Sequence, residues 1–255
     1  MNKINLALYG KILCNINDLQ SFVPDFLSLP TYLESPVYWK MLEALTSVRQ
    51  RKQFLSKSRL KQADYLMGIP KYFYDLVDLL QNQIKSSDAI NFEDDKIKKE
   101  IGGEIIVSKS GELYFKETGY SKNINLNSTA LGITNLGIIS LLVERGILAV
   151  GSYLFVDEPE VHLHPSWQKI MIDTLFELSK KGINIVIASH SIDMMKCIEH
   201  IMEQEESLNL DDHFGINQLN DKGETINTSD SVFIRISLIK MDLGKSFYEM
   251  FLESI

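Results

Sequence analysis

Hydrophobic and polar positions form their clearest pattern in residues 153–190. The runs YLFV at 153–156 and INIVIASH at 183–190 are short and nearly continuously apolar up to their polar ends, which is typical of strands covered on both faces. Between them, apolar residues recur at helical spacing from Trp167 to Leu178. A strand, a helix and a strand in this order predict a right-handed crossover within a parallel sheet.

Proline and glycine mark the ends of the predicted helices. Pro165 stands where the first turn of a helix tolerates proline, and Gly182 suits the C-terminal end of the same helix. An earlier segment, 136–143, is apolar on nearly all sides, as expected for a buried helix. Gly146 is placed to end that helix.

The first part of the chain has a different character. From Tyr38 onward apolar residues recur at helical spacing, and we expect residues 1–95 to form a mainly helical lobe. Residues 101–119 then alternate apolar and polar positions around a turn at Gly111, which predicts a β-hairpin. The sequence thus predicts two domains, 1–95 and 96–255.

The last part of the chain completes an α/β pattern. We expect a further helix over about 191–202 and, in the tail 230–255, a strand-like piece followed by an amphipathic helix. Together with the crossover unit, these elements predict an α/β fold with a parallel sheet flanked by helices.

Composition and charge narrow the function classes. With 255 residues, 45% of them hydrophobic, the chain can build a sizeable core, and its formal net charge of −8 argues against a generally basic nucleic-acid coat. One stretch, residues 47–62, nevertheless carries only basic charges: Arg49, Arg51, Lys52, Lys57, Arg59 and Lys61. That stretch is either a solvated helix face or a local DNA contact.

The chain contains no candidate membrane segment. No run approaches the ~20 apolar residues needed to cross a bilayer, and the N-terminal apolar stretch is broken by Tyr9, Gly10 and Lys11 without a cleavage site. We therefore expect a cytoplasmic protein with no membrane partner.

Polar residues follow both predicted strands of the crossover unit. Asp157 and Glu158 come directly after the first strand, and Ser189 and His190 end the second. Ligands of open parallel sheets bind beyond the carboxyl ends of the strands, where both clusters fall. The alternatives are a surface acidic pair and an ordinary strand-end histidine.

An apolar strand followed by Asp-Glu is the Walker B pattern of nucleotide hydrolases. In that pattern the aspartate holds Mg²⁺, usually through water, and the adjacent glutamate polarises the water that attacks the γ-phosphate. A histidine at the end of the neighbouring strand can donate a hydrogen bond to that phosphate. The two clusters therefore favour an ATP-dependent chemistry with Mg²⁺ as cofactor.

The motifs LFVDEPEVHLHP and IVIASHS resemble the catalytic half of ABC-type ATPases. The likeness is to the branch that contains SMC, RecF and the overcoming-lysogenization-defect proteins, and most closely to bacterial AAA-type ATPases of phage-defence systems. It covers roughly residues 100–200. It implies a P-loop NTPase-type sheet with an incomplete N-terminal lobe and a helical insertion lobe.

The resemblance assigns roles to individual residues. By position, Asp157 is similar to the Mg²⁺-binding aspartate, Glu158 to the catalytic glutamate and His190 to the switch histidine. The stretch 161–165, VHLHP, is similar to the D-loop at a dimer interface, which makes His164 a candidate nucleotide-binding residue.

Residues 128–139 lie where the family has its signature motif, with Gly132 as its glycine and Ser128 as its serine, although the usual Ser-Gly-Gly run is absent. In the family this motif reaches across a dimer to the ATP of the other subunit, with backbone N–H groups facing the γ-phosphate. The resemblance thus implies a homodimer or a complementary ATPase subunit. It also implies coupling to DNA or to a nuclease partner.

The sequence departs from the family at the phosphate loop. The pattern G-x-x-x-x-G-K-[ST] does not occur, and Gly10-Lys11 lacks both the earlier glycine and the following hydroxyl residue. Three explanations stay open: a truncated gene product, half of a split ATPase, or a degenerate ATPase kept as a binding module. The last of these corresponds to a rival function, a non-catalytic interaction module that dimerises without hydrolysing ATP.

A zinc site is the remaining alternative for the histidine-rich stretch. His162 and His164 alternate and could point to the same side of an extended segment, where His190 or Glu160 could join them. Cysteine and histidine partners at the usual zinc spacing are missing from the sequence, so we favour interface and packing roles for these histidines.

Overall fold

The computed structural model describes residues 4–8, 30–34, 36–45, 47, 71–81, 95–109, 111–220, 222–226 and 229–253. By their internal contacts the residues form two compact units. One unit combines Met1–Glu34 with Leu148–Ile255, and the other is Ser35–Ile147. The second unit is therefore an insertion in the chain of the first.

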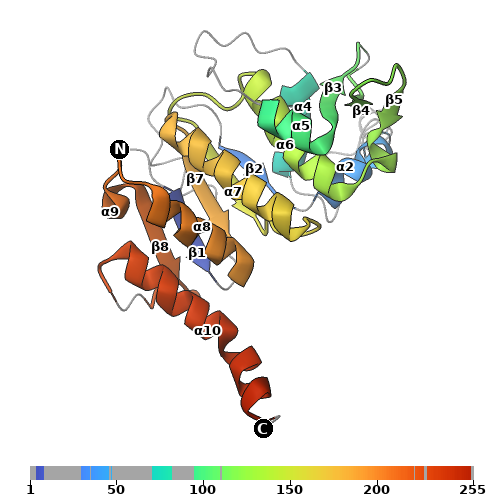
Figure 1. The fold of residues 1–255 in the computed structure, drawn as a ribbon. Helices are drawn as coiled ribbons and strands as arrows, with labels where there is room; N and C mark the ends of the chain where they lie inside the picture. The colour runs from blue at the N-terminus through green and yellow to red at the C-terminus, as the bar shows by residue number, and fades with distance from the viewer. Residues whose placement is uncertain are drawn as a thin grey trace, which may run out of the picture. The chain divides into compact units, whose positions relative to one another are not determined.

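The first unit is built on a parallel sheet (Figure 1). Within the described residues, this sheet has five strands in the order β2-β6-β7-β1-β8, and every neighbouring pair is parallel. The strands are β1 (Ile4–Leu8), β2 (Thr31–Leu33), β6 (Tyr153–Asp157), β7 (Asn184–Ala188) and β8 (Phe214–Gln218). The α/β fold with a parallel sheet, expected from the sequence, is confirmed.

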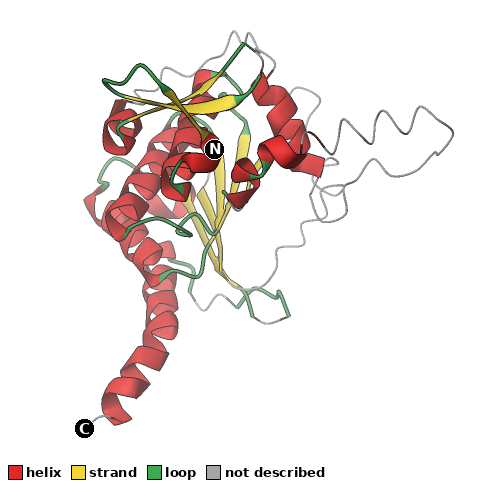
Figure 2. Cartoon of the chain, turned by 90° about the vertical axis from the view of Figure 1, so that its right-hand side faces the viewer, coloured by secondary structure: helices red, strands yellow, loops and turns green. Residues whose placement is uncertain are grey.

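Helices α7 (Pro165–Lys180), α8 (Ile192–Gln204) and α10 (Val232–Glu253) lie side by side on one face of the sheet, with α8 between the other two (Figure 1, Figure 2). The short helix α9 (Leu210–His213) leads into β8. The connection from β6 through α7 to β7 is the predicted crossover, and the helix predicted over about 191–202 is α8.

Local chemistry sets both ends of α7. Proline occupies its first turn, where no intrahelical N–H bond is lost. At its C-terminal end, Gly182 has φ +95° and donates its N–H to Ser179 O at 3.0 Å, and Ile183 donates to Leu178 O at 3.2 Å. These two bonds satisfy carbonyls that the helix leaves free. The prediction that Gly182 ends this helix is thus confirmed.

Strands β6 and β7 are buried on one face and half-buried on the other. Leu154 and Ile185 are 0% exposed, whereas Tyr153 and Phe155, which alternate with Leu154, are half-buried. The sequence predicted strands covered on both faces; in β6 and β7 alike one face is buried and the other is half-buried. Aromatic side chains occupy its partly exposed face, and Phe155 stacks with Tyr153 at 6.3 Å and with Tyr32 of β2 at 6.4 Å between ring centroids.

The inserted unit combines helices with a small antiparallel sheet. Its elements are α2 (Val37–Lys40), α4 (Lys71–Gln81), α5 (Asp95–Ile101), β3 (Gly103–Val107), β4 (Leu113–Glu117), β5 (Asn123–Asn125), the 3₁₀ turn η1 (Leu126–Ser128) and α6 (Leu131–Glu144). The antiparallel pair β3-β4 is the hairpin predicted around Gly111, whose φ is +84°. α6 is buried from Leu136 to Val143, as predicted, and Gly146 ends it with φ +67°.

One expectation about the ends of the chain needs correction, the strand-like piece in the tail. Before residue 95 the described elements are the strands β1 and β2 and the helices α2 and α4. The mainly helical lobe over 1–95 stays a prediction, and the contacts group the chain differently from a division at residue 95. That domain boundary stays a prediction. The tail carries no strand between Val232 and Glu253, because this stretch is one continuous helix. The basic run 49–61 and Gly10-Lys11 lie outside the described residues.

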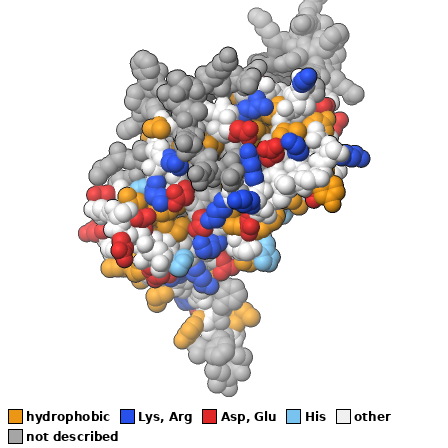
Figure 3. Space-filling view, turned by 45° about the horizontal axis from the view of Figure 1, so that its top comes forward, with side chains coloured by type: hydrophobic (Ala, Val, Ile, Leu, Met, Phe, Trp, Pro, Cys, Tyr) orange, Lys and Arg blue, Asp and Glu red, His pale blue; other side chains and the backbone are white. Residues whose placement is uncertain are grey.

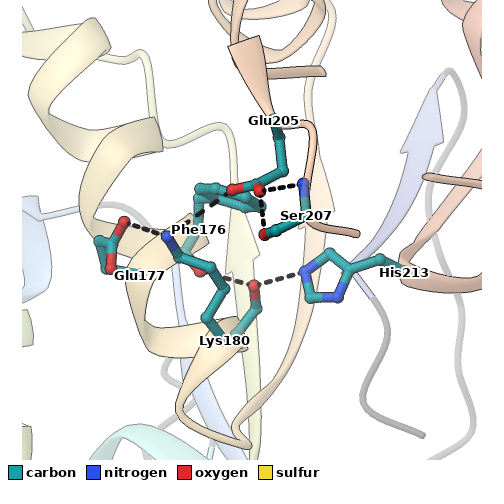
Figure 4. Close-up of polar contacts among 7 residues, drawn as sticks. Phe176, Glu177, Lys180, Glu205, Ser207 and His213 are labelled. Carbon is teal, nitrogen blue, oxygen red and sulfur yellow. Dashed lines mark hydrogen bonds and ion pairs between the residues drawn. The ribbon is translucent and has the colours of Figure 1, made fainter. Parts of the chain in front are cut away.

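A polar and aromatic cluster fixes the segment between α8 and β8 against α7 (Figure 4). His213 Nε2 lies 3.0 Å from Ser179 Oγ, and its ring packs edge-on against Phe176. Lys180 lies over the Phe176 ring and 3.8 Å from Glu205. Burial lowers the pKa of His213, which keeps this imidazole neutral within the cluster. Ser179 is 1% exposed, so the Ser-His contact serves packing rather than chemistry.

Among the described helices, none combines the length and the apolar character that a membrane span requires.

Candidate functional site

The loops that follow β6 and β7 meet at the carboxyl edge of the parallel sheet. The two strands are paired in register from Tyr153 with Asn184 to Asp157 with Ala188. The N–H of Glu158 donates to Ala188 O at 2.8 Å, which extends the pairing by one residue. The residue after Ala188 is Ser189, so both polar clusters begin at the same level of the sheet.

The structure brings Glu158 and His190 into contact. Nδ1 of His190 lies 3.2 Å from Oε1 of Glu158 and 3.9 Å from Oε1 of Glu160. Both Glu158 and His190 are more than half exposed, whereas only 9% of the Glu160 side chain is exposed. A proton on Nδ1 facing the carboxylates leaves Nε2 available for a ligand. Glu158 and His190 therefore form a solvent-accessible pair of a carboxylate and an imidazole, close to the buried carboxylate of Glu160.

Glu160 ties the two loops together. Its Oε1 accepts a hydrogen bond from Ser189 Oγ at 2.7 Å and another from the backbone N–H of His190 at 3.3 Å. Its Oε2 is buried and has no hydrogen-bond partner within the described structure. A buried carboxylate oxygen without a hydrogen bond lowers the stability of a fold by about 1–3 kcal/mol or more. Oε2 of Glu160 is thus a buried acceptor without a donor among the described residues.

Backbone strain accompanies the loop after β6. Glu158 has φ +46° and His162 has φ +66°, a left-handed conformation that costs non-glycine residues about 1–2 kcal/mol each. Two tight turns result, in which Val161 N–H donates to Glu158 O and Leu163 N–H to Glu160 O, both at 3.0 Å. Strain of this kind gathers at functional sites, where the surrounding structure holds it in place.

Asp157 sits in a concentration of negative charge. It is about half-buried, and its pKa is raised, first by that burial and then by the neighbouring carboxylates of Glu158 and Glu34. A hydrogen bond from Tyr32 acts in the opposite direction. A divalent cation would relieve this repulsion, and carboxylate oxygens are the ligands that Mg²⁺ prefers. Asp157 would thus supply one carboxylate to a Mg²⁺ ion that keeps most of its water ligands, since the described residues place no group of three or more His, Cys, Asp or Glu side chains around a metal ion.

Tyr32 and Glu34 were not anticipated as site residues. They come from β2, a three-residue strand paired with β6, and from the residue that follows it. The segment TYLE lies between Pro30 and Pro36. Prolines on both sides favour a short extended segment, and this pattern could have indicated β2 from the sequence.

The histidine-rich stretch does not form a metal cluster. In the part of the chain that the structure describes, no group of three or more His, Cys, Asp or Glu residues is placed to hold a metal ion. His164 instead caps α7, and its Nδ1 accepts from the Ser166 N–H at 3.3 Å. His162 is exposed. The geometry gives no support to the zinc alternative, and nucleotide binding by His164 stays a prediction.

Ser128 and Gly132 lie in the inserted unit, apart in the chain from the strand-end residues. Ser128 is exposed and ends η1, and Gly132 is buried in the first turn of α6. Ala130 caps α6 without a side-chain hydrogen bond, and no acidic residue stands in its first turn. The first N–H groups of a helix have no acceptor within the helix, and the signature-motif role of Ser128 and Gly132 stays a prediction.

Comparison with known proteins gives one result that bears on this site. A family model described as an AAA ATPase domain matches residues 34–195, which is more than half of the chain. The match includes Glu34, the inserted unit, and both strand-end clusters. The parallel sheet flanked by helices is consistent with the P-loop NTPase-type fold of such domains. No curated protein matches the sequence.

Proposed function

The chain belongs to the AAA ATPase domain family, and from this premise we propose that Asp157, Glu158 and His190 form the hydrolytic half of an ABC/SMC-like ATP site. An ATPase domain implies a nucleotide and Mg²⁺. The observation that carries the proposal is the contact between Glu158 and His190 at the ends of two adjacent parallel strands.

Each residue has a role that its surroundings support. The exposed carboxylate of Glu158 accepts a proton from the attacking water and orients that water. His190, with Nδ1 held beside Glu158, presents Nε2 as a hydrogen-bond donor to the γ-phosphate when both ring nitrogens carry protons. Asp157 holds Mg²⁺, through water, beside its neighbouring carboxylates. Bound Mg²⁺ supplies charge neutralisation of the phosphate oxygens.

The remaining sequence predictions complete an ATP sandwich between two subunits. Ser128, Gly132 and the start of α6 contact the γ-phosphate held by the other subunit. His164 and the rest of the VHLHP loop lie at the dimer interface. The partner is a second copy of this chain or a complementary ATPase subunit.

We further propose a role in the overcoming-lysogenization-defect-like branch, with hydrolysis coupled to DNA or to a nuclease partner in phage defence. Charge argues against a broad DNA-binding surface. The net charge is −8, and on the face drawn in Figure 3 Lys and Arg side chains lie among Asp and Glu side chains. Both couplings stay open in this proposal, and a DNA contact would rest on the basic run 49–61.

The test is Mg²⁺-dependent ATP hydrolysis by the purified chain. Glu158→Gln should lower kcat by about 10²- to 10⁴-fold, because it removes the proton acceptor, while Mg²⁺-ATP binding persists. Glu177→Gln, the same chemical change on the exposed surface of α7, is the matched control and should leave kcat unchanged.

The second candidate function is the non-catalytic interaction module. The sequence has no G-x-x-x-x-G-K-[ST] pattern, which is compatible with this module as well as with a truncated or split ATPase. Calorimetric titration with Mg²⁺-ATP separates the two: no binding by the wild-type chain, with or without candidate partner subunits, would support the module and contradict the hydrolytic half-site.

A further inference from the structure

Glu160 is the buried member of the strand-end cluster and has no role in the half-site as described so far. It differs from Glu158 in exposure, 9% against 51% of the side chain, and in its contacts. The contacts of Glu160 are to the loop that carries His190, at Ser189 Oγ and at the His190 N–H.

We propose that Glu160 is a positioning residue that fixes the backbone and ring of His190, so that movement of the loop after β6 is transmitted to the switch histidine. This inference rests on the proposed function of the site. Glu160 makes no contact with the reacting atoms in this proposal and acts only through His190.

The hydrogen bonds form a continuous path. Ser189 Oγ, which donates to Glu160, accepts from the N–H of Ser191 at 3.1 Å. Ser191 Oγ in turn accepts from the N–H of Met194 and so caps α8. A shift of Glu160 would therefore disturb the residues on both sides of His190 and the first turn of α8.

The strained backbone makes this loop suitable for transmission. Glu158 and His162, which flank Glu160, both have positive φ, and the Leu163 N–H donates to the Glu160 carbonyl. The position of Glu160 is thus set by the same two turns that carry the VHLHP loop. Any event that reshapes those turns, including contact with a second subunit, moves the acceptor on which the His190 backbone depends.

The unpartnered Oε2 argues that Glu160 is not present for stability alone. A buried acceptor without a donor costs free energy, and replacing a buried charge by a neutral group of the same shape is often neutral or stabilising. Glutamine keeps the shape and one carbonyl oxygen for Ser189 and His190, whereas alanine keeps neither. The two substitutions therefore separate positioning from bulk packing.

The experiment compares Glu160→Ala, Glu160→Gln and Ser189→Ala in the full chain. Ring ¹⁵N and ¹H signals of His190, identified with His190→Gln, report its environment without requiring hydrolysis. We expect Glu160→Ala to shift or broaden these signals, Ser189→Ala to shift them in the same direction, and Glu160→Gln to leave them close to wild type. For kinetics, Glu160→Ala should lower kcat by about 100-fold with little change in KM, and Glu160→Gln should restore it.

The outcomes separate this inference from the proposed function. Unchanged His190 signals in folded Glu160→Ala would overturn the positioning role, whatever the ATPase result. If Glu160→Ala does not fold, the signals of Ser189→Ala and Glu160→Gln decide the question. A wild-type chain that neither binds nor hydrolyses Mg²⁺-ATP would contradict the proposed function, while the His190 signals would still test the contact made by Glu160.

Discussion

At the scale of single residues, the raised pKa of Asp157 makes the stability of the fold depend on pH. Its pKa is raised above the ordinary value of 3.8, chiefly by burial and by Glu158. The folded chain therefore holds this proton more tightly than the unfolded chain, so the associated stability is present below pH 3.8 and is lost as the pH rises through the raised pKa. At neutral pH the ionised carboxylate opposes folding.

Asp157→Asn should accordingly raise the Tm at pH 7. We expect a modest increase of about 1–3 °C, because Asp157 is half-exposed and solvent screens its repulsion. The same change should remove the Tm increase that Mg²⁺-ATP gives the wild-type chain. Thermal scans with and without Mg²⁺-ATP check both parts. A lower Tm without ligand would contradict the assignment of Asp157 to a repulsive cluster.

The sequence predicted that two strands end in polar groups at one edge of the sheet, and the structure places these groups together there. The contact between Glu158 and His190 follows from that register, because adjacent parallel strands bring their carboxyl ends together. Tyr32, Glu34 and the link made by Glu160 depend on pairing or packing between distant segments. The pattern of apolar and polar residues within one segment does not indicate contacts between distant segments. The sequence analysis therefore did not include these residues in the site.

At the scale of elements, the packing of α6 on the hairpin depends on one glycine. A Cβ added at Gly137 would lie 2.8 Å from Cδ1 and Cγ1 of Ile105 on β3 and 3.4 Å from Cδ1 of Ile101. Gly137→Ala should therefore destabilise the chain by about 1–3 kcal/mol through overpacking, despite the better helix propensity of alanine. Chemical denaturation measures this free energy of unfolding.

The double variant Gly137→Ala with Ile105→Val is the control for that prediction. Ile105→Val removes Cδ1, one of the two atoms that would lie 2.8 Å from the new Cβ, and leaves Cγ1, so it relieves part of the overpacking and the two free-energy changes should not add. Strict additivity would show that the close approach of α6 to β3 is not what requires glycine. Both elements were predicted from sequence, but their contact was not, since periodicity gives the buried face of a helix and not the partner that covers it.

At the scale of the whole molecule, the chain order differs from the spatial grouping. The inserted unit Ser35–Ile147 separates β2 from β6, its direct neighbour in the sheet, and β1 pairs with β7 and β8 from late in the chain. The sequence predicted the local crossover from β6 to β7 because it spans one continuous segment. The family resemblance implied a helical insertion lobe, but the bounds of the insertion and the pairing of β1 and β2 were not predicted, because strand pairing across long intervals leaves no periodic signal.

This grouping puts Ser128 and Gly132 in a different unit of the chain from Glu158 and His190, and the proposed ATP sandwich requires them to meet between two copies. Ser128→Glu adds a negative charge at an exposed position that the proposed sandwich puts beside the phosphates, and Glu158→Gln removes the proposed proton acceptor. Each variant alone should be inactive. An equal mixture should recover about a quarter of wild-type hydrolysis, because half of the dimers are mixed and each mixed dimer has one intact site.

The matched control for this mixture is Asn127→Glu, which places the same charge on the adjacent exposed residue of η1. It should retain most of the wild-type rate because it leaves Ser128 and the start of α6 intact. The measurement is the hydrolysis rate of each variant and of the mixture, at protein concentrations above and below the dissociation constant of the dimer. If the mixture stays as inactive as its components while both bind Mg²⁺-ATP, the two half-sites act within one chain, and the sandwich between subunits is wrong.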